Sequence, residues 1–178
     1  MTSSTSRGFT LVELMITIAV LAIGSMLAYP SFSNVIKSNR VATSTNNVIA
    51  AFNLARSEAI RSNRGGGVCP SKDGASCEGV DWNEGFIAFT DQDASGTWSP
   101  GDKVIRYFEP NDALEFSAVP VGAAGTTVEV MAFERSGRAK QGAKLTVKAA
   151  SCKTGQEYVR VIELTKPGQT RMKKEACA

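Results

Sequence analysis

The chain has 178 residues, of which 43% are hydrophobic and 21% are charged, a composition typical of a folded protein with a hydrophobic core. It contains no histidine, which excludes His-based catalytic triads, histidine general bases and the commonest zinc ligand sets. The net charge of +3 is too small to indicate a nucleic-acid partner by itself.

Residues 9–29 form an apolar run whose single charge is Glu13. At about 1.5 Å rise per residue, a helix of this length spans roughly the hydrocarbon core of a bilayer. A buried core helix and a cleaved secretory signal are the alternatives, but the run has no polar stripe and no small-residue cleavage site after it. The sequence therefore predicts a transmembrane helix over 9–29. Arg7 on its flank predicts a cytoplasmic N-terminus and an exported remainder.

Glu13 lies inside the apolar run of residues 9–29. An ionised carboxylate within an apolar run is costly unless it meets a cation. The sequence GFTLVE at residues 8–13, followed by the apolar run, resembles the class III leader of type IV pilins and pseudopilins. The resemblance implies that a prepilin peptidase removes the leader 1–8 by cutting after Gly8 and methylates the amine of Phe9. It also implies that Glu13 docks the subunit by pairing with the N-terminal ammonium of a neighbouring pilin.

Residues 30–64 are predicted to continue the helix with one apolar face. Apolar side chains recur there at steps of three to four residues, and glycine is absent until Gly65-Gly66-Gly67, which is expected to end the helix. The triple glycine lacks the Lys-Ser/Thr pair of a phosphate-binding loop. Residues 53–61 resemble the helix end of the FimT/GspH family of minor pilins and type II secretion pseudopilins.

Short β-rich runs separated by turn residues follow the glycines. Strands are expected at 85–90, 103–108, 114–119, 127–133, 144–149 and 157–164. Alternating apolar and polar residues in the last two runs indicate strands with one buried face. Together with the resemblance, this predicts an α+β, type IV pilin-like fold. A long N-terminal helix, transmembrane in its first half, would pack on an antiparallel β-sheet in a periplasmic head over 65–178.

Four cysteines suit an exported protein whose thiols are oxidised in the periplasm. Three pairings are possible, and sequence proximity favours Cys69 with Cys77 and Cys152 with Cys177. The second pair also resembles an arrangement in members of the family. Zinc binding through four thiolates is the alternative, but the spacings lack paired CxxC motifs.

Residues 91–102 resemble a calcium-binding loop. Asp91, Asp93, Ser95 and Asp102 stand at loop positions 1, 3, 5 and 12, with Gly96 at position 6. However, the flanking segments are predicted strands rather than helices, and a polar hairpin connection would have the same composition. A turn is therefore favoured over a calcium site, and no cofactor is expected.

The C-terminal segment is basic. Residues 148–178 hold seven Lys and Arg against three Glu, whereas residues 1–147 hold 13 against 14. Such a segment is more often a solvated surface than a ligand site. FimT-type proteins implicated in DNA uptake carry a Gly-Arg-x-Arg pattern, and the corresponding residues 168–171 retain only the second arginine. The resemblance implies a DNA contact at Arg171, and the charge of this segment, expected to be a flexible tail, adds Lys166, Lys173 and Lys174 as candidates for sequence-independent phosphate contacts.

The predicted function follows from these resemblances. The chain is expected to be a minor pilin that contributes to type IV pilus assembly and binds double-stranded DNA in natural transformation. Its expected location is the bacterial inner membrane and then a filament, with other pilins as partners. The alternative is a pseudopilin of a type II secretion system, which needs no DNA. No nucleophile or acid/base group set is recognisable, so catalysis is not expected.

Overall fold

The computed structural model describes residues 8–122 and 126–178, except for the side chains of residues 27–31. It divides into a unit that ends at Lys37 and a compact unit over Ser38–Ala178, here called the head. Among the described residues, no helix is both long and apolar enough to cross a membrane. The transmembrane helix expected over 9–29 includes positions whose side chains are not described, and it stays a prediction. The leader expected over 1–8 lies outside the described residues, apart from Gly8.

One long helix opens the fold. Helix α1 covers Leu11–Ser62, and its part within the head buries one face. The buried apolar residues recur at steps of three, four or seven, as one helical face requires: Val41, Val48, Ala51, Phe52, Ala55 and Ala59. Three of them are alanines spaced four residues apart, so this face has little side-chain bulk. A strand backbone can therefore approach the helix closely.

The helix ends before the triple glycine. The amide of Asn63 donates to the carbonyl of Ile60, the amide of Arg64 donates to the carbonyl of Ala59, and Asn63 has a φ of 54°. This pattern is a Schellman motif, in which asparagine can take the left-handed position usually held by glycine. The expectation that the glycines end the helix was therefore wrong, because Asn63 already provides the reversal.

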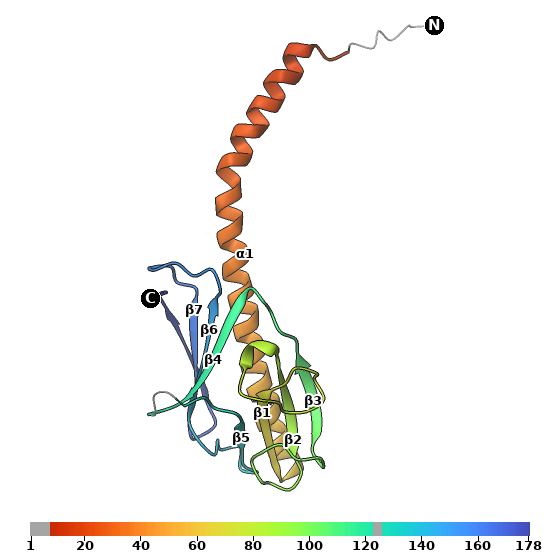
Figure 1. Ribbon diagram of the computed structural model, residues 1–178, viewed down its shortest axis with the longest axis vertical. Coiled ribbons are helices and arrows are strands. Elements are labelled where there is room, and N and C mark those ends of the chain that lie inside the picture. Colours follow the sequence, from red (N-terminus) through yellow and green to blue (C-terminus); the bar gives the residue numbers. More distant parts are fainter. Residues whose placement is uncertain (1–7, 123–125) are drawn as a thin grey trace, which may run out of the picture. The chain divides into compact units, whose positions relative to one another are not determined.

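The head contains two antiparallel four-stranded sheets (Figure 1). The first has the order β3-β2-β1-β5, built from Lys103–Phe108, Phe86–Asp91, Gly65–Pro70 and Met131–Phe133. The second has the order β4-β6-β7-β8, built from Leu114–Pro120, Ala143–Ala149, Val159–Leu164 and Thr170–Glu175. A short 3₁₀-helix, η1, covers Trp82–Glu84. The predicted α+β fold with a helix packed on antiparallel strands is confirmed, with two sheets in the head.

The prediction from the sequence did not include strands β1 and β8, and it made strand β5 too long. Strand β1 begins with the triple glycine, β8 lies in the expected flexible tail, and β5 is shorter than the run expected over 127–133. In β1, a Cβ on Gly66 would overlap the carbonyl oxygen of Ala55 in α1, and a Cβ on Gly67 would lie 2.6 Å from the Phe89 ring. These glycines thus allow β1 to lie between the helix and the aromatic side chain of β2.

The core of the head joins α1 to both sheets. Trp82 of η1 is fully buried, and its indole Nε1 donates to the carbonyl of Val128 at 2.8 Å. Phe86 of β2 stacks on Phe108 of β3, with 4.9 Å between the ring centroids. Because the same core includes residues of α1 and of strands from each sheet, the head is one packing unit.

Two disulfides close loops at opposite ends of the head's sequence. Cys69 bonds to Cys77 across eight residues, and Cys152 bonds to Cys177 across 25 residues. These are the two pairings that sequence proximity favours. The second joins the segment after β6 to the residues after β8 and so restricts the C-terminal strand at its end.

Replacing Cys152 and Cys177 together with alanine is expected to lower the free energy of unfolding by about 3 kcal/mol, because the 25-residue loop is no longer restricted in the unfolded chain. Urea unfolding under non-reducing conditions measures the change. As a control, reductant should destabilise the wild type more than the variant, which has only one disulfide to lose. A change below about 1 kcal/mol would contradict the assigned role.

Candidate functional site

The predicted docking residue Glu13 lies at the start of α1. The Thr10 hydroxyl accepts a hydrogen bond from the Glu13 amide at 3.2 Å, and Glu13 Oε2 lies 3.5 Å from the Thr10 amide nitrogen and hydroxyl. These reciprocal contacts form a capping box, which satisfies amides that a helix start leaves free. The Glu13 carboxylate therefore contacts Thr10, the residue that follows Phe9 in the sequence.

The first part of α1 presents apolar side chains that nothing in its unit covers. The large apolar residues whose exposure is described between Phe9 and Ile36 are 48–82% exposed. An apolar surface of this length is unusual for a soluble monomer and requires lipid or protein around it. Glu13 is the only acidic group of this surface.

The basic C-terminal segment is a strand rather than a flexible tail. Strand β8 pairs with β7 along its whole length, with Thr170 opposite Leu164 and Glu175 opposite Val159. Five of its six residues are exposed, because β8 is the edge of the second sheet. The expectation of a flexible tail was therefore wrong: cross-strand hydrogen bonds and the nearby disulfide fix the backbone that carries these cations.

The strand distributes its basic residues over two faces, since neighbouring side chains of a strand point in opposite directions. Arg171 and Lys173 share one face, where Glu163 lies opposite Arg171. Lys174 points to the other face and forms an ion pair with Glu157 at 2.7 Å. The hydrogen bond and charge of Lys174 hold the pKa of the Glu157 carboxyl below its usual range. The structure therefore does not bring the predicted DNA-binding residues together as one cluster.

Lys166, the fourth predicted DNA-binding residue, lies in the turn between β7 and β8 and is exposed. The turn is closed by bonds from the Gly168 amide to the Thr165 carbonyl and from the Thr165 amide to the Gln169 carbonyl. Gly168 has a φ of 81°, and a Cβ on it would overlap the carbonyl oxygen of Gly137. The turn thus packs directly on the segment around Gly137.

The segment around Gly137 carries basic residues that the sequence-based prediction did not include. It is a tight turn in which the Glu134 amide donates to the Arg138 carbonyl at 2.8 Å. Arg56 of α1 donates from Nε to the Gly137 carbonyl at 3.0 Å. Arg135, Arg138 and Lys140 are exposed on this segment. The sequence did not predict that this segment lies next to Lys166, because the two are far apart in the chain and no local motif links them.

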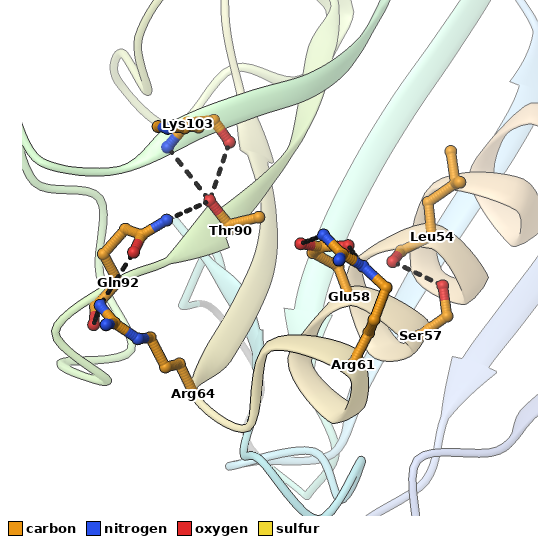
Figure 2. Close-up of polar contacts among 8 residues, drawn as sticks. All are labelled: Leu54, Ser57, Glu58, Arg61, Arg64, Thr90, Gln92 and Lys103. Carbon is orange, nitrogen blue, oxygen red and sulfur yellow. Dashed lines mark hydrogen bonds and ion pairs between the residues drawn. The ribbon is translucent and has the colours of Figure 1, made fainter.

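Two further arginines lie at the end of α1. Figure 2 shows Arg61 turned toward Glu58 on the same helix and Arg64 reaching Gln92 after β2. Arg61 and Glu58 form an ion pair at 2.6 Å. Arg64 Nη1 donates to the carbonyl and to the side-chain oxygen of Gln92, both at 2.9 Å. The charge of Arg61 is therefore balanced by a carboxylate, whereas Arg64 meets only neutral acceptors in these two bonds.

The loop between β2 and β3 gathers the predicted calcium ligands. The carboxylate oxygens of Asp91, Asp93 and Asp102 lie within 4.8 Å of one another. Backbone amides already donate to all three: those of Ser95 and Gly96 to Asp91, of Ser95 to Asp93, and of Gln92 and Ser99 to Asp102. Burial raises the pKa of Asp91, and the Ser95 amide lowers that of Asp93. These contacts form a hairpin connection, and the choice of a turn over a calcium site stays a prediction.

Comparisons with known proteins place these features in a family. The family model described as "Type II transport protein GspH" matches residues 44–168, and the model described as "Prokaryotic N-terminal methylation motif" matches residues 3–29. A comparison with curated proteins finds no match.

Solved structures show a similar fold. The type IV minor pilin FimU of Pseudomonas aeruginosa matches with a TM-score of 0.56 at 18% identity, over 79% of this chain and 96% of FimU. The minor pseudopilin EPSH from the type II secretion system of Vibrio cholerae matches with a TM-score of 0.53 at 14% identity, over 79% of this chain and 98% of that one. At these identities the likeness concerns the fold.

Proposed function

Because the chain belongs to the GspH family of minor pilins and pseudopilins, we propose that it is a minor pilin of a type IV pilus that also binds DNA. A prepilin peptidase cuts after Gly8 and methylates Phe9, and the mature subunit then joins a filament with other pilins. Before assembly, the N-terminal helix holds the subunit in the bacterial inner membrane, with the N-terminus cytoplasmic and the head periplasmic.

The observation that carries the assembly role is the exposed apolar surface of the first part of α1 with Glu13 at its start. Lipid covers such a surface before assembly, and the helices of neighbouring subunits cover it afterwards. The carboxylate of Glu13 then needs a cation, because the surroundings are apolar in both states. The N-terminal ammonium of a neighbouring subunit supplies it and fixes where the subunit docks.

DNA binding rests on the exposed cations of the C-terminal region. Arg171 and Lys173 are exposed on a paired strand and Lys166 in the hydrogen-bonded turn before it, so they can contact phosphates without first ordering a tail. Lys174 contributes less, because Glu157 already neutralises it. Such contacts give binding that is independent of sequence and weakens with salt.

The test is a titration of a labelled short DNA duplex with the full chain in non-ionic detergent, across a salt series. Replacing Arg171, Lys173 and Lys174 together with alanine is expected to reduce the slope of log affinity against log salt by about 2, since Lys174 is already paired. A variant that binds with the wild-type slope would remove these residues from the contact. Absence of wild-type binding at roughly 50 mM salt would remove the DNA role itself.

A pseudopilin of a type II secretion system is the second candidate. The family description and the fold of EPSH favour it, and the exposed apolar helix would serve a secretion filament equally well. Such a subunit needs no DNA contact. Binding in the duplex titration would therefore favour the DNA-binding minor pilin, whereas no binding would leave a minor pilin without a DNA role or a secretion pseudopilin.

A further inference from the structure

The positive charge of the folded chain is concentrated in three segments that are far apart in sequence. Residues 56–64 at the end of α1, residues 134–140 after β5 and residues 165–169 between β7 and β8 hold seven Lys and Arg against two Glu, a net charge of +5. The rest of the chain holds 13 Lys and Arg against 15 Asp and Glu, a net charge of −2. We call these three segments the basic junction.

Hydrogen bonds and close packing hold the three segments together. Arg56 Nε donates to the Gly137 carbonyl at 3.0 Å, which ties the helix end to the second segment. The Ala139 amide donates to the Lys166 carbonyl at 3.0 Å, which ties the second segment to the third. Gly168 completes the contact, since only a residue without a side chain fits against Gly137 there. The basic junction is therefore a fixed surface of the head.

Most cations of the basic junction have no acidic partner. Among the residues that the structure describes, Arg61 is the one cation of the junction with a carboxylate oxygen within 4.0 Å. Arg135, Arg138 and Lys166 are exposed and free of such pairs, whereas on β8 Lys174 is paired and Arg171 lies opposite a glutamate. Unpaired cations release more counterions on meeting phosphates than paired ones, so they contribute more to binding.

A hollow of about 460 Å³ adjoins the basic junction. Its charged lining residues are three cations and three acids: Arg64, Arg135, Lys140, Asp91, Asp93 and Glu134. Lys140 also donates from Nζ to the Ala94 carbonyl at 3.1 Å, which directs its charge toward the acidic loop. The hollow therefore has a mixed charge, whereas Arg138 and Lys166 of the basic junction lie outside its lining.

We propose that the basic junction is the main phosphate-binding surface of the head, and that the duplex DNA of the proposed function binds there more than on β8. The inference rests on that function and assigns its location. Arginine suits the role because its planar guanidinium binds phosphate oxygens through two parallel hydrogen bonds. Three segments that meet at one fixed surface can contact several phosphates of one duplex at once.

The experiment compares three triple variants of the full chain in the duplex titration. The junction variant carries R135Q, R138Q and K166Q, and the strand variant carries R171A, K173A and K174A. The control variant carries K103Q, K144Q and K153Q, three exposed lysines outside the junction, and so removes the same charge. The junction variant is expected to lose about 3 from the salt slope and roughly 10-fold or more in affinity, the largest loss of the three.

Each outcome has one interpretation. A junction variant that binds as tightly as wild type, or no more weakly than the control variant or the strand variant, overturns the proposed location while DNA binding stands. A wild type that does not bind the duplex overturns the DNA role and the location together. The melting temperature of each variant shows whether it is folded.

A second measurement does not depend on how the variants fold. A photo-cross-linking residue is placed at Ser136 within the junction, and in a separate protein at Ser117 on β4, both of which are exposed. Cross-linking to duplex DNA from position 136 and not from 117 supports the inference. Cross-linking from 117 alone, or from neither position while the duplex is bound, overturns it.

Discussion

Replacing Gly66 with alanine is expected to lower the free energy of unfolding by about 3 kcal/mol. Gly66 is buried in β1, and its added Cβ would overlap the carbonyl oxygen of Ala55. Because a backbone oxygen within a helix cannot rotate away, β1 or α1 must shift, and overpacking of this kind costs about 1–3 kcal/mol or more. Urea unfolding measures the loss.

Gly101 provides the matched control for that substitution. It lies in the hairpin connection between β2 and β3, its Cβ would meet no atom within 4 Å, and it does not require a left-handed backbone. Gly101→Ala is therefore expected to change the free energy of unfolding by less than about 0.5 kcal/mol. A Gly66→Ala variant as stable as Gly101→Ala would show that β1 does not lie as close to α1 as described.

Glu13→Gln is expected to reduce incorporation of the subunit into filaments by about 100-fold, since removing one partner of a desolvated ion pair costs roughly 3–5 kcal/mol. Glutamine is the informative replacement because its carbonyl oxygen can still accept from Thr10 and keep the capping box. The variant therefore removes the charge and leaves the helix start intact. The measurement is the amount of the subunit in sheared filaments relative to that in membranes.

Two controls separate docking from capping and processing. Thr10→Ala removes the hydroxyl that caps the Glu13 amide, at about 1 kcal/mol of helix stability, and keeps the carboxylate, so normal incorporation is expected. The mass of the mature Glu13→Gln chain should match a methylated Phe9 at its N-terminus. If Glu13→Gln incorporates normally and Thr10→Ala does not, the carboxylate acts as a cap and not in docking.

The fold could be predicted where the residue pattern reports burial on one side. Strands β6 and β7 alternate because one face lies on the core, and α1 repeats its apolar residues for the same reason. Strand β8 gives no such signal, since the edge position leaves five of its six residues exposed. Strand β1 reads as a loop because its first half consists of glycines, which normally disfavour strands. Here the absence of side chains is what the packing requires.

The candidate site also has one part that the sequence could predict and one part that it could not. Gly8, Phe9 and Glu13 belong to one short motif, so the sequence alone suffices to predict their roles, and the model of the methylation motif matches the same region. The basic junction has no such motif, because Arg56 and Gly137 are 81 residues apart in sequence. The distribution of charges along the sequence instead predicted a DNA-binding segment at the C-terminus, because it does not show that Lys174 is neutralised by Glu157. Only the contacts between segments identify the surface.

The lysines of β8 have a consequence that does not depend on any ligand. As the edge of its sheet, β8 leaves a row of backbone amides and carbonyls unpaired, which makes it a template for a strand from another molecule. Lysines on an edge strand oppose such pairing, because a second copy would bring like charges together. Because Glu157 already neutralises Lys174, it is the charge of Lys173 that also protects the head against self-association.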